Sequence, residues 1–153
     1  MNHEERAIQN FMNGCNCAQA VFLAFAPELG ISDDLALRLS SSFGGGMGRL
    51  REVCGAVSGM LMAAGGLYGY ADLSDAAAKA DHYALVQALA GQFREQFGSI
   101  ICRELLDRKG AEPPDPDART PDYYAKRPCA RFVGGAARIL EQYMAQNAPT
   151  PLP

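Results

Sequence analysis

Five cysteines are the residues of this chain most able to do chemistry: Cys15, Cys17, Cys54, Cys102 and Cys129. An odd number argues against a framework of structural disulfides. Thiolates are nucleophiles and soft metal ligands, so metal binding, redox catalysis and simple burial as small apolar side chains all stay open. The last four cysteines are separated by 36, 47 and 26 residues, which match no compact zinc or ferredoxin motif. A shared site would therefore have to be assembled by the fold.

Four of these cysteines are predicted to lie in or near the first turn of a helix. Each follows a signal for helix initiation: Asn16 before Cys17, a glycine-rich turn before Cys54, Ser99 before Cys102, and Pro128 at the first helical position before Cys129. The free N–H groups and the positive dipole end of a helix start favour a thiolate and can donate to metal-bound sulfur. This pattern favours one buried redox or metal site, with cysteine burial as the competing interpretation.

Other residues are weaker candidates. Cys15 forms a Cys-x-Cys pair with Cys17, which can supply a dithiol or two ligands but is also a common coincidence. The glycine-rich stretch Gly44–Arg49 lacks the Gly-Lys-Ser/Thr ending of a phosphate-binding loop, so we expect a sharp turn that approaches the cysteine site closely. We expect His3 at a mobile chain end, and His82 in a structural or surface role within a helix.

Apolar periodicity and capping signals predict an all-α, compact helical bundle in a single domain, residues 1–153. The expected helices span residues 4–12, 17–29, 33–42, 52–68, 74–97, 100–106 and 129–146. The 52–68 helix should be central, because Gly55, Gly59 and Ala63 form a smooth stripe for close packing within the chain or in a homodimer.

Two segments are expected outside the helices. Residues 107–122 hold four prolines among charged residues, which predicts a surface loop rather than a domain linker. Residues 148–153 are expected to form a frayed tail.

Composition excludes several partners. The net charge of −3 provides no basic surface for nucleic acid. Residues 53–71 carry no charge, but five glycines and a lack of flanking anchors favour a buried helix over membrane insertion. The charged N-terminus does not resemble a secretory signal, so we expect a cytoplasmic protein.

Three segments, with the last two cysteines, resemble a known family. Residues 16–21 read Asn-Cys-Ala-Gln-Ala-Val, residues 43–48 read Phe-Gly-Gly-Gly-Met-Gly, and residues 54–59 read Cys-Gly-Ala-Val-Ser-Gly. Followed in order by Cys102 and Cys129, they are similar to the signature of the C_GCAxxG_C_C family, described as redox-active. The resemblance spans nearly the whole chain. Split-Soret cytochromes c, which resemble this family, hold an iron–sulfur cluster together with haems. The resemblance thus implies iron–sulfur binding here, and the absence of Cys-x-x-Cys-His removes the expectation of haem.

Three functions are therefore in competition. The leading hypothesis is an electron-transfer or redox-sensing protein that binds a [2Fe–2S] or similar cluster through Cys17, Cys54, Cys102 and Cys129. The second is a metal-free thiol–disulfide oxidoreductase, and the third is an interaction module with a structural zinc ion held by four cysteines. The sequence specifies neither the redox partner nor a substrate, and it leaves open whether there is catalytic turnover.

Overall fold

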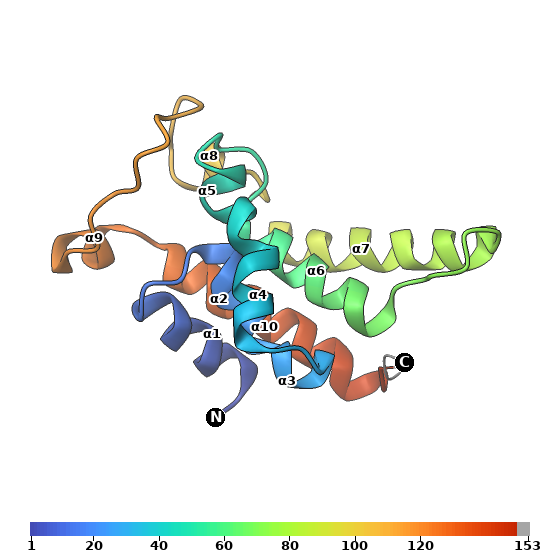
Figure 1. Ribbon diagram of the computed structural model, residues 1–153. Coiled ribbons are helices and arrows are strands. Elements are labelled where there is room, and N and C mark those ends of the chain that lie inside the picture. The colour runs from blue at the N-terminus through green and yellow to red at the C-terminus, as the bar shows by residue number, and fades with distance from the viewer. Residues whose placement is uncertain (150–153) are drawn as a thin grey trace.

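The computed structural model describes residues 1–149, which form helices joined by turns and loops (Figure 1). The helices are α1 (His3–Met12), α2 (Cys17–Ala24), α3 (Ala26–Leu29), α4 (Asp33–Ser40), the 3-10 turn η1 (Ser41–Phe43), α5 (Gly44–Met47), α6 (Gly55–Tyr68), α7 (Ala76–Phe97), α8 (Cys102–Leu105), α9 (Pro121–Lys126) and α10 (Cys129–Gln146). Strand pairing in this part of the chain is limited to one isolated antiparallel bridge, between Val53 and Ile101. The all-α prediction is confirmed.

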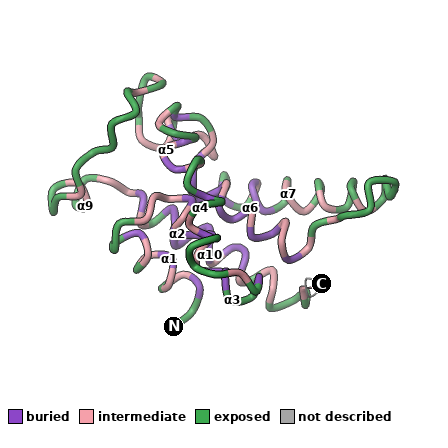
Figure 2. Tube along the Cα trace, in the orientation of Figure 1, coloured by how far each residue is buried: buried purple, intermediate pink, exposed green. Residues whose placement is uncertain are grey.

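Helix α6 lies at the centre, in contact with α2, α7 and α10, while α1 packs on α2 and α10. Buried residues gather where α2, α6 and α10 meet (Figure 2). Helix α7 extends away from this core and buries side chains only in its second half, at Leu89, Ala90 and Phe93. Within residues 1–149, no helix combines the length and apolarity required to cross a bilayer.

The small-residue stripe on α6 has the predicted packing role. A Cβ added to Gly59 would lie 2.6 Å from the carbonyl oxygen of Ala18, so the backbones of α2 and α6 are in direct contact. A Cβ added to Gly55 would lie 3.1 Å from the Cβ of Cys17. The close approach of the two helices therefore places the start of α2 beside the start of α6.

Several helix boundaries differ from the prediction. The expected 17–29 helix is divided at Phe25, and the second part ends at Gly30 in a left-handed conformation with φ 67°. The expected 33–42 helix ends at Ser40 and continues as the 3-10 turn. The central helix begins at Gly55 rather than at residue 52, because residues before it are extended and Val53 pairs with Ile101.

The region after α7 differs more. The helix expected over residues 100–106 begins at Cys102, because the Ser99 hydroxyl accepts the N–H of Ile101 instead of capping the helix. The loop expected over residues 107–122 ends early, since Pro121 begins α9 with Thr120 as its N-cap. Of the expected frayed tail, residues 150–153 lie outside the described part of the chain.

The prediction of a mobile His3 is wrong. The side chain is buried, stacked on Phe25 at 4.3 Å between ring centroids. Its Nδ1 lies 2.7 Å from Oε1 of Glu141, and its Nε2 lies 2.7 Å from Oε1 of Glu28. His3 therefore ties α1 to α3 and α10. His82 lies on α7, where its ring and that of Tyr70 form a T-shaped pair with centroids 6.2 Å apart.

Candidate functional site

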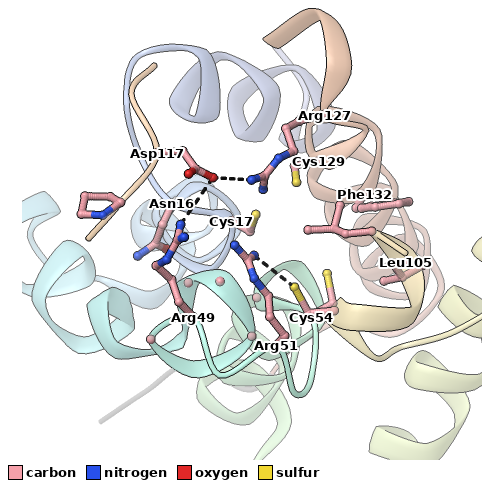
Figure 3. Close-up of a pocket in the computed structure, with 18 of the residues that line it drawn as sticks. Asn16, Cys17, Arg49, Arg51, Cys54, Leu105, Asp117, Arg127, Cys129 and Phe132 are labelled. Carbon is pink, nitrogen blue, oxygen red and sulfur yellow. Dashed lines mark hydrogen bonds and ion pairs between the residues drawn. The ribbon is translucent and has the colours of Figure 1, made fainter. Parts of the chain in front are cut away.

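One cavity of about 370 Å³ is lined by cysteines from four separated segments: Cys17, Cys54, Cys102 and Cys129 (Figure 3). All four are free thiols, and all except the half-buried Cys17 are buried. Cys15, also free and half-buried, is not among the residues that line the cavity. The fold thus gathers the four candidate site residues and leaves the fifth cysteine apart.

Each of the four cysteines sits at a helix start, as predicted. Cys17 is the first residue of α2, where Asn16 and Gln19 form a reciprocal capping box. Cys54 is the N-cap of α6 and faces the N–H groups of Ala56 and Val57. Cys102 and Cys129 are the first residues of α8 and α10. One detail differs, because Pro128 is the N-cap of α10 rather than its first residue.

The isolated bridge brings Cys54 and Cys102 to the same side of the backbone. On either side of the Val53–Ile101 pair, the N–H of Cys54 donates to Ile100 at 2.8 Å and the N–H of Cys102 donates to Glu52 at 2.6 Å. Side chains alternate along extended chains, so Cys54 and Cys102 occupy diagonal positions on one face. Such positions typically have Cβ atoms about 7 Å apart or somewhat less.

The other two cysteines, Cys17 and Cys129, form a second pair. The neighbouring Cys17 thiol lowers the pKa of Cys129 to about 7 despite burial, with help from the positive charges of Arg127 and Arg51. Interaction with Cys129, together with burial, raises the pKa of Cys17 well above its usual value. Burial raises the pKa of Cys54 to about 12. The Cys129 thiol therefore ionises more readily than the thiols of Cys17 and Cys54.

Arginines face the cysteines from two segments. Arg51 is 3% exposed, and its Nη1 lies 3.5 Å from Sγ of Cys102 while its Nε lies 2.6 Å from Oε1 of Glu112. Arg127 is ion-paired with Asp117 (Figure 3). The sequence interpretation did not select these arginines. The position of Arg127 two residues before Cys129 is the signal that could have indicated it.

The glycine-rich segment forms the sharp turn that was predicted, and it is left-handed. Gly45, Gly46 and Gly48 have φ values of 70°, 67° and 59°. A Cβ on Gly46 would lie 2.7 Å from the Cβ of Cys102, so the turn does approach the cysteine site closely. Arg49 and Arg51 also have positive φ, 71° and 58°. This conformation costs an L-residue about 1–2 kcal/mol, and strain of this kind is typical of functional sites.

Residues 107–120 cover part of the cavity. Arg49 holds this segment, since its Nε donates to the carbonyl of Pro113 at 2.7 Å and its carbonyl accepts the N–H of Glu112 at 2.9 Å. Arg119 anchors the other end by donating to the carbonyl of Cys15 at 3.0 Å and stacking on Phe11. The predicted surface loop is therefore part of the wall of the site.

The donor set is chemically suited to iron, although it is not a compact single-ion site. Within residues 1–149, no three His, Cys, Asp or Glu side chains are arranged to hold one metal ion. In a [2Fe–2S] cluster with four cysteine ligands, each of the two irons is bound by two cysteines. Such a cluster therefore requires two pairs of cysteines rather than three or four ligands around one ion. The pairs Cys17–Cys129 and Cys54–Cys102 match this requirement in the number and type of ligands.

Comparison with known families identifies the chain. A family model described as "Putative redox-active protein (C_GCAxxG_C_C)" matches residues 15–143, which include every cysteine and the glycine-rich turn. The chain belongs to this family. Comparisons with curated proteins and with solved structures give no match. The family is described as redox-active, and cysteine thiols are side chains able to carry such chemistry.

Proposed function

We propose that this protein binds an iron–sulfur cluster of the [2Fe–2S] type and acts in electron transfer or redox sensing. The ligands would be Cys17, Cys54, Cys102 and Cys129. The observation that carries the proposal is the gathering of these four thiols, from four helix starts, around one cavity. When bound, the cluster would supply one-electron chemistry.

The surroundings of the thiols support an anionic centre. An oxidised [2Fe–2S] cluster with four thiolate ligands carries a net charge of −2 by formal counting. The Arg51 guanidinium beside Cys102 and the Arg127 guanidinium beside Cys129 supply compensating positive charge. Hydrogen bonds and charges near the sulfurs raise the reduction potential of such a centre, because they favour the more negative reduced state.

One observation favours the metal-free alternative. Cys17 and Cys129 line the same cavity and shift each other's pKa, and the lowered pKa of Cys129 makes it the nucleophile of the pair. The Cys129 thiolate would attack a disulfide substrate, releasing one thiol. The Cys17 thiol, losing its proton, would then displace the second thiol and form a Cys17–Cys129 disulfide. Two electrons pass from the protein to the substrate in this reaction.

Serine substitution separates the two functions. We expect anaerobically purified protein to be brown, and replacing any of the four cavity cysteines by serine to remove most of the visible absorption and bound iron. The free energy of unfolding should fall together with the iron content, because metal binding is coupled to folding. The matched control is Cys15→Ser, which changes a cysteine outside the cavity and should keep the colour. Colourless protein that contains zinc would indicate a structural metal site. Colourless, metal-free protein that forms a Cys17–Cys129 disulfide would support the dithiol reaction.

A further inference from the structure

The cysteine cavity carries more positive than negative charge. Four arginines line it, and the carboxylates ion-paired with them belong to Glu112 and Asp117, so positive charge exceeds negative by two. Even one ionised thiol would leave an excess. The whole chain has a net charge of −3. The positive charge is therefore concentrated at the site rather than spread over the surface.

Each carboxylate is shared by more than one arginine, so the positive charge of the arginines is only partly compensated. Glu112 is in ion-pair contact with Arg49, Arg51 and Arg108, and Asp117 with Arg49 and Arg127. The side chains of Arg49 and Arg127 are only 15% and 12% exposed. Charges held away from water interact strongly with an added anion, and a planar guanidinium binds carboxylate or phosphate oxygens in a bidentate manner.

Arg119 adds a further positive charge to the wall. It donates to the carbonyl oxygens of Phe11 and Cys15 and stacks on Tyr123 at 4.9 Å. Among residues 1–149, no carboxylate lies within ion-pair distance of it. An arginine compensated only by carbonyls and aromatic faces makes the neighbourhood more attractive to an anion.

The guanidinium groups point into the same hollow. In Figure 3, Arg49 and Arg127 extend from opposite sides toward Asp117, and Arg51 extends between Cys17 and Cys54. Two of the three are held by strained backbone, since Arg49 and Arg51 have positive φ. Backbone strain persists in a folded protein only where surrounding contacts hold the strained residue in place. Such residues are concentrated at functional sites.

We propose that the metal-free cavity binds a small organic anion beside its thiols. The anionic end, a carboxylate, sulfonate or phosphate, is held by Arg49, Arg51 and Arg127. The rest of the ligand lies against an apolar wall that includes Leu105, Leu106 and Phe132. The cavity volume of about 370 Å³ is within the range of small-molecule sites. The inference goes beyond cluster binding and needs no iron.

Paired alkylating reagents test this directly. Iodoacetate and iodoacetamide are both small and consume the same thiolate, so the ratio of their rates at Cys129 does not depend on how far the thiol is ionised. Peptide mapping separates labelling at Cys129 from labelling at Cys17. In reduced, metal-free protein we expect the iodoacetate-to-iodoacetamide ratio at Cys129 to be about tenfold higher than in the same protein unfolded in urea.

Variants and a competitor define the site. Arg49→Gln and Arg127→Gln should each lower the ratio severalfold, whereas Arg38→Gln, which removes the same charge from an exposed position on α4, should not. Circular dichroism checks that each variant is folded. Sodium phosphate should protect Cys129 of the wild-type protein from iodoacetate, and sodium chloride at equal ionic strength should not.

Two results would overturn the inference. One is a folded-state ratio no higher than the unfolded-state ratio. The other is equal protection by phosphate and chloride, which would indicate general screening rather than a site. The wild-type measurements are decisive even where a variant fails to fold. Because every measurement uses metal-free protein, a failure here leaves cluster binding intact, and a failure to bind iron leaves this inference intact.

Discussion

Replacing Gly46 by alanine should damage the turn that positions the cysteine site. Two costs combine. Alanine at φ 67° is strained by about 1–2 kcal/mol. Its Cβ would lie 2.7 Å from the Cβ of Cys102, 2.7 Å from the backbone nitrogen of Glu52 and 2.8 Å from the Cα of Arg51. None of these atoms is the end of a flexible side chain, so an overpacking cost of about 1–3 kcal/mol applies. The free energy of unfolding should fall by about 2–5 kcal/mol.

Gly48→Ala is the matched control. Gly48 has a similar φ of 59°, but a Cβ there would meet no heavy atom within 4 Å. Only the backbone strain of about 1–2 kcal/mol should remain. Urea unfolding followed by far-ultraviolet circular dichroism measures both variants, and equal m-values would show that the difference is one of stability.

Comparing the two variants tests the close approach of Gly46 to Cys102 rather than the general effect of replacing a glycine. The Gly46→Ala variant should be less stable than the Gly48→Ala variant by at least about 1 kcal/mol, the lower estimate for overpacking. Equal losses would mean that Gly46 does not pack against Cys102, and the described close approach would be wrong. A stability order in the opposite direction would refute the assignment of the turn altogether.

Three further predictions concern His3, the cysteine thiols and the cap of α2. Although burial raises the pKa of Glu141, the hydrogen bonds from His3 hold it below its usual value. His3→Gln should therefore cost about 1.5–3 kcal/mol at pH 7, and in unfolding experiments the part due to Glu141 should shrink below about pH 4, as that carboxylate becomes protonated. In reduced, metal-free protein, alkylation of Cys129 should rise through a midpoint near pH 7, whereas Cys54 should stay unreactive until the protein unfolds; equal pH profiles for the two thiols would contradict the assigned charges. Asn16→Ala should destabilise the protein by about 1 kcal/mol through loss of the capping box, and an unchanged melting temperature would show that the cap is dispensable.

Local signals predicted much of the site. Asn16 is a strong N-cap, and it located the start of α2 and hence Cys17 at a helix N-terminus. The stripe that contains Gly59 predicted close packing of the central helix because small residues permit it regardless of the partner. Such features depend on neighbours in sequence, so they can be recognised without the fold.

What the sequence did not reveal depends on long-range contacts. Ser99 looks like a helix cap, but pairing of Val53 with Ile101 extends the backbone and delays the helix to Cys102. The start of α9 at Pro121 was hidden by the surrounding prolines, although a threonine before a proline is a known start signal. Apart from Arg127, which lies two residues before Cys129, the arginines of the cavity carried no local signal, because long-range contacts such as that between Arg51 and Glu112 place them there.

The content of iron and acid-labile sulfide in anaerobically purified protein tests the central claim most directly. We expect two irons and two sulfides per chain, with both lost together when Cys17 or Cys102 is replaced by serine. Protein that holds no iron after anaerobic purification and after reconstitution with iron and sulfide, while its four cavity thiols remain reduced and titratable, would contradict it.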